Sequence, residues 1–337
     1  MNKIISKLLL FSGFLFLCIG VKAQDSKKVL ATASMIADMA QNIAGDRLMI
    51  ECIVPIGGDP HLYDPIPEDA RKAANADLII KNGLTFEGWL NELIDNSGTK
   101  AKQVLVTEGI DAVESLAYKN SADPHAWMNA MNGIIYVENI TKALIELDPE
   151  GEQTYRINSE TYIKKLQTLD QYIQDRVEEI PENNRVLITS HDAFQYYGRK
   201  YGIELEAILG TSTDAEEQTS DIMRVINVIR SRNIPAVFIE STVNPKLLQQ
   251  IAEDNSVKIG GQLYADSIGD KDSPASSYYD MLKYNTDVIV EGLKQEVQNT
   301  KRNTDDKPGF WTSGRIGLAL GVVMALILVF VANNIRK

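Results

Sequence analysis

The three histidines of the chain are the residues whose chemistry is most informative. His61, His125 and His191 are 64 and 66 residues apart. Neutral imidazole is the commonest metal ligand among side chains, and it binds only when deprotonated, so three imidazoles brought together would hold a transition metal at neutral pH. A zinc finger keeps its ligands a few residues apart, whereas these gaps need long segments of folded chain to close them. The histidines therefore indicate a metal site and a fold that brings distant segments of the chain together.

Each histidine is expected in a loop at the end of a strand. His61 lies in a turn-rich segment, 57–65, after an apolar run, and His125 lies in an Asp-Pro-His-Ala-Trp segment. His191 directly follows an apolar run at 185–189. Any one of them alone would more often be an ordinary loop residue. In parallel α/β sheets, however, ligands bind beyond the carboxyl ends of strands, so the shared position favours one common site.

Acidic residues near the ends of other strands extend this site. Asp266 follows the last predicted strand and would complete a set of three histidines and one aspartate, although by itself it is more typical of a solvated loop. Such a set suits Zn²⁺ well and Mn²⁺ less well, since manganese prefers more oxygen ligands. Glu240 is expected to point towards the same site and support the ligands, and Asp64 and Asp123 are further candidates for orienting the histidines.

The elements that must position these residues form two groups. Apolar, β-branched runs alternate with helical periodicity, which predicts stacked βα units and parallel sheets of four strands in two α/β lobes, 24–150 and 182–298. Residues 154–180 lack Gly and Pro and carry an apolar stripe, which predicts one long, stiff linking helix within 151–181. The predicted strands are 29–33, 48–54, 77–81, 103–106, 185–189, 203–209, 236–239 and 257–259, and a closing helix spans 278–293.

The N-terminal segment predicts export. Two lysines precede an apolar run that ends in Val-Lys-Ala, so residues 1–23 are predicted to be a secretory signal peptide. Cys18 follows Leu17 rather than a small residue, which favours ordinary cleavage after Ala23 over lipid attachment. The mature chain then keeps only Cys52, which cannot form an intramolecular disulfide and is expected to be a buried strand thiol.

The C-terminal segment predicts a membrane anchor. Residues 299–314 are predicted to be a flexible polar tether, and 315–333 a single transmembrane span. Its 17-residue apolar run spans roughly 26 Å as a helix, near the lower limit for a bilayer core. Because two basic residues end the chain, the positive-inside rule places the tail in the cytoplasm and the body at the periplasmic face of the inner membrane.

Composition limits the class of protein and of partner. The chain has 337 residues, of which 44% are hydrophobic and 24% charged, values typical of an ordinary globular protein. Its formal net charge is −12 at pH 7, so nucleic acid is not expected as a partner.

Five motifs in order resemble those of the zinc and manganese substrate-binding proteins of bacterial ABC transporters, in particular the TroA-like branch, over roughly residues 28–297. The resemblance implies two Rossmann-like lobes joined by a rigid backbone helix, with a metal site between the lobes. It also implies a protein without enzymatic activity that delivers a divalent metal ion to a permease in the inner membrane. The implied metal ligands are His61, His125, His191 and Asp266. The matching segments are 58–63, 123–127, 190–197, 238–241 and 260–269.

The same resemblance favours zinc while leaving manganese as the alternative. Family members specialised for manganese often have Glu where this chain has His191, but zinc members commonly carry a His-rich loop, and segment 109–122 has no histidine. The family usually has an acidic residue and proline after Trp127, whereas this chain has Met-Asn-Ala, in which Asn129 can still cap the next helix. A C-terminal membrane span is also unusual for the family.

Two other classes of protein compete with this interpretation. One is a zinc-dependent hydrolase in which three histidines hold the metal and Glu240 acts as base towards a metal-bound water. No H-E-x-x-H or other compact hydrolase motif is present in the sequence. The other is a metal-stabilised adhesion protein, which would need its metal in order to fold.

Overall fold

The computed structural model of the protein describes residues 26–115, 121–214 and 217–295. The predicted signal peptide (1–23), the tether (299–314) and the transmembrane span (315–333) lie outside these residues. The described chain forms an α/β fold with parallel strands and one long helix, as predicted.

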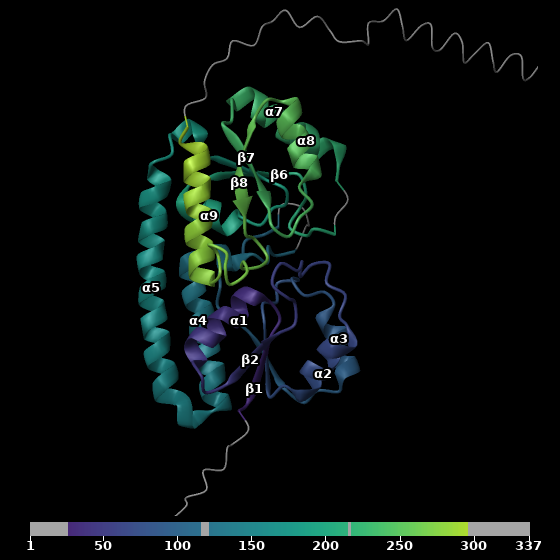
Figure 1. Ribbon diagram of the computed structural model, residues 1–337, viewed down its shortest axis with the longest axis vertical. Helices are drawn as coiled ribbons and strands as arrows, with labels where there is room; N and C mark the ends of the chain where they lie inside the picture. The colour runs from purple at the N-terminus through teal and green to yellow at the C-terminus, as the bar shows by residue number, and fades with distance from the viewer. Residues whose placement is uncertain (1–25, 116–120, 215–216, 296–337) are drawn as a thin grey trace, which may run out of the picture. The chain divides into compact units, whose positions relative to one another are not determined.

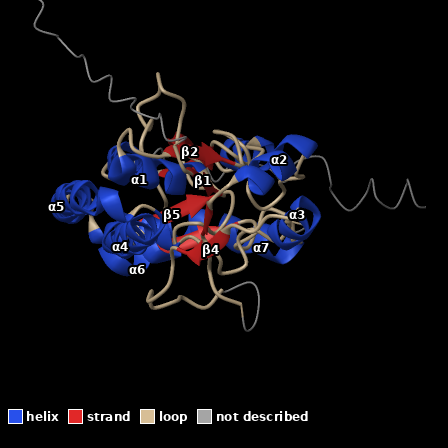
Figure 2. Ribbon diagram, turned by 90° about the horizontal axis from the view of Figure 1, so that it is seen from below, coloured by secondary structure: helices blue, strands red, loops and turns tan. Residues whose placement is uncertain are grey.

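The first lobe is a parallel sheet between two layers of helices (Figures 1 and 2). Side chains alternate between its two faces: Val29 and Ala31 enter the main core, whereas Leu30 enters a smaller core on the other face. Because both faces are buried, the two central strands, 28–31 and 78–81, are mostly apolar, whereas the outer strands 49–52 and 102–105 carry polar, partly exposed residues. The elements are β1 (Lys28–Ala31), α1 (Ser34–Ala44), β2 (Met49–Cys52), α2 (Pro67–Asn75), β3 (Leu78–Lys81), α3 (Leu90–Ser97), β4 (Lys102–Leu105), the 3₁₀ turn η1 (Ala126–Met128) and α4 (Ala130–Leu147).

The strand order in this sheet is β2-β1-β3-β4 within the described residues. Strand β2 therefore lies on one side of β1, and β3 and β4 lie on the other. Because all four strands are parallel, the loops after β2 and β4 leave from the same end of the sheet, the carboxyl end of the strands. The side chains of α2 and α3 pack on one face, while α1 and α4 belong to the main core on the other. This arrangement places the loops that carry His61 and His125 at one end of the lobe.

The second lobe has the predicted strands, but its hydrogen bonding differs from the predicted four-stranded sheet. In the described residues, strand 186–189 pairs with 204–207 and strand 236–240 pairs with 258–263, both in parallel. Strands 186–189 and 236–240 lie next to each other but form no backbone hydrogen-bond ladder. At this junction the Glu240 carboxylate, rather than a backbone carbonyl, accepts the N–H groups of Ser190 and His191. The elements are η3 (Glu182–Asn184), β5 (Val186–Thr189), α6 (Gln195–Tyr201), β6 (Glu204–Ala207), α7 (Thr219–Arg232), β7 (Ala236–Glu240), α8 (Lys246–Asp254), β8 (Lys258–Leu263) and α9 (Tyr278–Leu293).

One long helix joins the lobes. After the turn η2 (Pro149–Gly151), helix α5 (Glu152–Glu178) has 27 residues and is about 40 Å long. It contacts α1 and α4 of the first lobe and α9 of the second (Figure 1). Its buried side chains recur every three, four or seven residues and form the stripe expected of an amphipathic helix: Tyr155, Tyr162, Leu166, Leu169, Ile173 and Val177.

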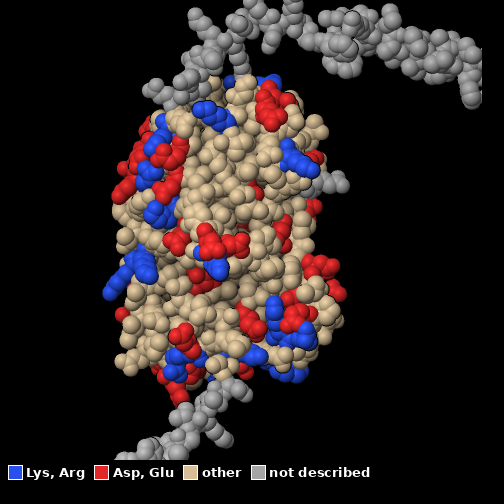
Figure 3. Space-filling view, in the orientation of Figure 1, with Lys and Arg blue, Asp and Glu red and all other residues tan. Residues whose placement is uncertain are grey.

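Ion pairs add to the contact between α5 and α9. Charged side chains of both signs gather over α5 in the space-filling view (Figure 3). Arg176 on α5 lies 3.2 Å from Asp287 and 3.1 Å from Glu291, both on α9. Partly exposed pairs of this kind each contribute little, so the apolar stripe carries most of the stability of this contact.

Helix α4, which follows His125, begins with a side-chain cap. Asn129 accepts a hydrogen bond from the Met131 N–H at 2.9 Å, the role that the sequence predicts for it. We expect Asn129→Ala to lower the free energy of unfolding by about 1 kcal/mol, because the N–H loses its partner. Urea denaturation of the metal-free chain measures this change. Asn129→Ser keeps an acceptor and should stay near wild type, and equal loss in both variants would contradict the capping role.

Candidate metal centre

The structure brings the four predicted site residues together from four separate loops. His61 and His125 follow β2 and β4 of the first lobe, and His191 and Asp266 follow β5 and β8 of the second. Each offers one ligand atom, and these atoms all lie within 4.8 Å of one another. Three of the residues are fully buried or nearly so, and the His61 side chain is 3% exposed. The site thus lies between the lobes, closed from solvent.

The spacing of these atoms fits a small tetrahedral ion. The Nε2 of His125 lies 3.3 Å from that of His61 and 3.4 Å from that of His191. Asp266 places one carboxylate oxygen 3.3 Å from His125 Nε2 and the other 3.3 Å from His191 Nε2. A tetrahedron with bonds of about 2.0–2.1 Å, the range for zinc with nitrogen and oxygen ligands, has edges of about 3.3–3.4 Å. The His61 Nε2 is more distant, 3.9 Å from the nearest Asp266 oxygen.

Carboxylates fix the orientation of two imidazoles. Asp123 Oδ1 lies 2.8 Å from both the backbone nitrogen and the ring Nδ1 of His125. Glu240 Oε2 lies 2.6 Å from His191 Nδ1, while its Oε1 accepts the backbone N–H groups of Ser190 and His191 at 2.9 Å each. A carboxylate beside Nδ1 keeps a proton on that atom, so in each neutral ring the lone pair of Nε2 points into the site.

His61 is held by its backbone and by ring packing. Asp59 Oδ1 accepts the His61 N–H at 2.9 Å, and the ring of the buried Phe86 meets the imidazole edge to face with centroids 5.0 Å apart. The turn before it begins at Gly57, whose φ of 80° favours glycine. The position of the ring thus depends on the local turn and on the first lobe's core.

Asp266 supplies the negative charge of the site. Its Oδ2 accepts a long hydrogen bond of 3.4 Å from Thr242 Oγ1. Its Oδ1 is buried and accepts no hydrogen bond from the described residues. A buried carboxylate oxygen normally has a partner, so a bound cation would satisfy this atom.

Burial and neighbouring charges move the pKa values of these groups in different directions. Burial lowers the pKa of His61 to about 3. Burial also acts to lower the pKa of His125, but the carboxylates of Asp123 and Asp266 outweigh it and raise that pKa to about 9. The pKa of His191 is likewise raised, by Glu240 and Asp266, and the histidines hold the pKa of Asp266 well below its usual range despite its burial.

We expect Zn²⁺ binding at about pH 7 to release about two protons. With raised pKa values, His125 and His191 are protonated in the metal-free chain, and each must lose a proton before Nε2 can bind a metal. The apparent affinity should therefore rise as the pH increases from 7 towards 9, the pKa of His125 being about 9 and that of His191 also raised. Titration calorimetry in buffers of different ionisation enthalpy counts the protons. A binding enthalpy that does not depend on the buffer would contradict this expectation.

Of the three residues predicted to orient the histidines, the structure places two beside a histidine and one away from them, and it adds two residues that were not predicted. Asp123 and Glu240 contact histidines, whereas Asp64 is exposed and makes no hydrogen bond to them among the described residues. Asp64 follows the turn and points its side chain to solvent. The sequence reasoning missed Asp59 and Phe86. A signal for Asp59 exists, because the tripeptide Asp-Pro-His occurs at both 59–61 and 123–125, and in both copies the Asp oxygen accepts the His N–H.

Comparison with known proteins decides the family. The model of the family described as ZnuA, zinc-uptake complex component A, periplasmic, matches residues 29–292. The chain belongs to this family. The predicted resemblance to metal-binding proteins of ABC transporters is confirmed.

Relatives of this ZnuA-family chain are named for different metals. The manganese ABC transporter substrate-binding lipoprotein scaA of Streptococcus gordonii is 38% identical over 273 residues, 79% of this chain and 88% of the relative. The iron ABC transporter substrate-binding lipoprotein MtsA of Streptococcus pyogenes serotype M1 is 40% identical over 277 residues, 80% of this chain and 89% of the relative. The structure of the periplasmic zinc-binding protein TroA from Treponema pallidum is similar, with a TM-score of 0.76 and 32% identity over 80% of this chain and all of that chain.

The predicted C-terminal membrane anchor, and the place at the inner membrane that depended on it, is contradicted by these comparisons. Both scaA and MtsA are named lipoproteins, a class that is attached by lipid rather than by a spanning helix. The prediction depended on a run of apolar residues near the lower length limit for a span, which is a weak signal. In the described part of the chain, no helix has both the length and the apolar character needed to cross a membrane.

Proposed function

We propose that this ZnuA-family chain is a substrate-binding protein that captures one divalent transition-metal ion, with zinc favoured, and delivers it to the permease of an ABC transporter. His61, His125, His191 and Asp266 would hold the ion as cargo. The observation that carries the proposal is the convergence of three imidazole nitrogens and a buried carboxylate at tetrahedral spacing. Three deprotonated imidazole nitrogens and a carboxylate offer a donor set that suits a divalent cation.

Zinc is favoured by the donor set and manganese is the alternative. Three nitrogens and one carboxylate suit four-coordinate zinc: His125 Nε2 lies 3.3–3.4 Å from the other two ring nitrogens and 3.3 Å from Asp266 Oδ1, while His61 Nε2 is 3.9 Å from that oxygen. Both oxygens of Asp266 face histidines, however, so a two-oxygen contact would give five ligands and suit manganese or iron better. The names of scaA, MtsA and TroA cover manganese, iron and zinc respectively.

The contacts of Glu240 argue against the hydrolase alternative. One oxygen of Glu240 accepts two backbone N–H groups, and the other lies 2.6 Å from His191 Nδ1. A general base must reach the water that attacks the substrate. A carboxylate engaged on both oxygens, on the side of the imidazole away from the site, is placed to orient His191 instead.

A competitive titration tests the proposed function. The purified full chain is stripped of metal, then titrated with Zn²⁺ and Mn²⁺ against a chelator, and the bound ion is identified by anomalous scattering at each absorption edge. We expect one equivalent of metal and preference for Zn²⁺. Failure to bind either ion stoichiometrically would overturn the proposal, and preference for Mn²⁺ would overturn the choice of zinc.

A further inference from the structure

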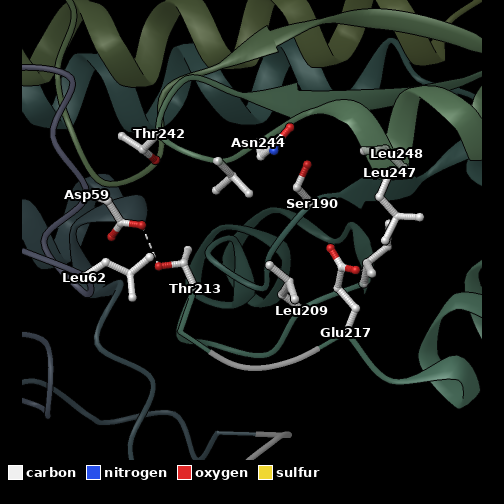
Figure 4. A pocket seen from close by; sticks show the side chains of 12 residues that line it. Asp59, Leu62, Ser190, Leu209, Thr213, Glu217, Thr242, Asn244, Leu247 and Leu248 are labelled. Carbon is white, nitrogen blue, oxygen red and sulfur yellow. Dashed lines mark hydrogen bonds between the residues drawn. The ribbon is translucent and has the colours of Figure 1, made fainter.

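A cavity of ≈ 520 Å³ lies beside the metal centre (Figure 4). Its lining residues are close neighbours of the proposed ligands: Asp59 lies two residues before His61, and Ser190 directly precedes His191. Thr242, which also lines it, donates to the Asp266 carboxylate. None of the four proposed ligands is itself among the lining residues.

One hydrogen bond crosses between the lobes at this cavity. Thr213, in the loop after β6 of the second lobe, donates its hydroxyl to Asp59 Oδ2 of the first lobe at 2.6 Å, and Figure 4 shows the two side chains facing each other. The other oxygen of Asp59 accepts the His61 N–H. The Asp59 carboxylate thus connects the backbone of His61 to the opposite lobe, and the Gly57 N–H at the start of the same turn donates to Ser267 Oγ of that lobe at 2.8 Å.

His61 is the proposed ligand that a metal ion would lose first. It is the only one of the four whose side chain is not fully buried, and its Nε2 is the most distant from Asp266. Among the described residues, its Nδ1 has no carboxylate beside it comparable to those of His125 and His191. Its position therefore depends on the turn that Asp59 holds.

We propose that the hydrogen bond between Asp59 and Thr213 is a latch that sets the rate at which the metal leaves. Thr213 is a positioning residue: it holds Asp59, and Asp59 holds the loop of His61 in the closed arrangement. When the bond opens, the His61 loop is released towards the cavity and the ion gains a path to solvent. This inference rests on the proposed function, because it takes the ion as cargo.

The latch predicts an effect on dissociation without an effect on the ligands. Thr213→Val removes the hydroxyl and keeps the shape, whereas Thr213→Ser keeps the hydroxyl and is the matched control. The full chain is loaded with Co²⁺, whose visible band reports the ligand set, and chased with excess EDTA in a stopped-flow instrument. We expect roughly two- to tenfold faster dissociation for Thr213→Val, the range for one lost hydrogen bond, with an unchanged band and association rate. Thr213→Ser should dissociate at the wild-type rate.

Other outcomes are distinguishable. If Thr213→Val dissociates at the wild-type rate, or if Thr213→Ser is accelerated equally, the latch is overturned while the proposed function stands. An altered Co²⁺ band in Thr213→Val also overturns it, because Thr213 would then act on the ligand set. If the wild-type chain binds no Co²⁺, Zn²⁺ or Mn²⁺, the proposed function itself fails.

Discussion

Replacing His191 with alanine is expected to lower the affinity for Zn²⁺ by more than about 100-fold, beyond the range typical of residues that only orient a ligand. The substitution removes one of four donors. It also leaves the fully buried carboxylates of Glu240 and Asp266 without the imidazole that each faces at 2.6 and 3.3 Å. Competition with a chromophoric chelator measures the affinity of the full chain.

The control for His191→Ala separates loss of a ligand from loss of the fold. Ser212→Ala, a change in the loop that also carries Thr213, should bind Zn²⁺ like wild type. Thermal unfolding of the metal-free His191→Ala chain should remain cooperative, because the two larger cores are made of many apolar side chains besides the few that pack against the histidines. Wild-type affinity in His191→Ala would show that this residue is not a ligand.

The four clustered residues of the proposed metal site could be predicted from the sequence, because the ends of the strands can be recognised in the sequence pattern. His191 follows a buried four-residue strand at once, and His61 follows β2 through a turn rich in Gly and Pro. In a parallel sheet the carboxyl ends of the strands lie at the same end of the sheet, so residues that follow different strands come close together in space. The apolar stripe of α5 could also be predicted from the sequence, since apolar residues recur at helical spacing along this 27-residue helix.

The remaining features depend on contacts that the sequence does not encode locally. Glu240 bonds to the backbone 49 and 50 residues away and replaces part of the expected ladder between β5 and β7. Asp59 meets Thr213 across 154 residues. Asp64, which has the same chemistry as Asp59 and lies in the same turn-rich segment, faces solvent. Residue type and motif could not rank these aspartates, because only the folded turn decides which way each side chain points.

Charge and orientation at the site have a common origin. The carboxylates beside Nδ1 of His125 and His191 both direct Nε2 into the centre and favour the protonated ring when no metal is present. A metal ion must therefore displace protons, and in return it meets ligands whose rings are already oriented. In the part of the chain that the structure describes, His61 has no such carboxylate beside its Nδ1, and burial lowers its pKa to about 3, so the ring is neutral at pH 7.

Glu240→Gln tests this orientation and is expected to weaken Zn²⁺ binding by about 10- to 100-fold. The amide oxygen can still accept the backbone N–H groups of Ser190 and His191, so the local fold is kept. The amide nitrogen, however, would present an N–H to His191 Nδ1 in place of a carboxylate oxygen. The ring would then carry its proton on Nε2, the atom that must bind the metal.

Asp64→Asn is the matched control for Glu240→Gln. It makes the same kind of change, carboxylate to amide, at an exposed acid close to His61 that makes no hydrogen bond to the histidines among the described residues. Chelator competition should give a wild-type affinity for Asp64→Asn and a weakened one for Glu240→Gln. If both variants weaken binding equally, the effect is one of net charge near the site. If neither does, the proton on His191 is set by something other than Glu240, and the assignment of its orienting role is wrong.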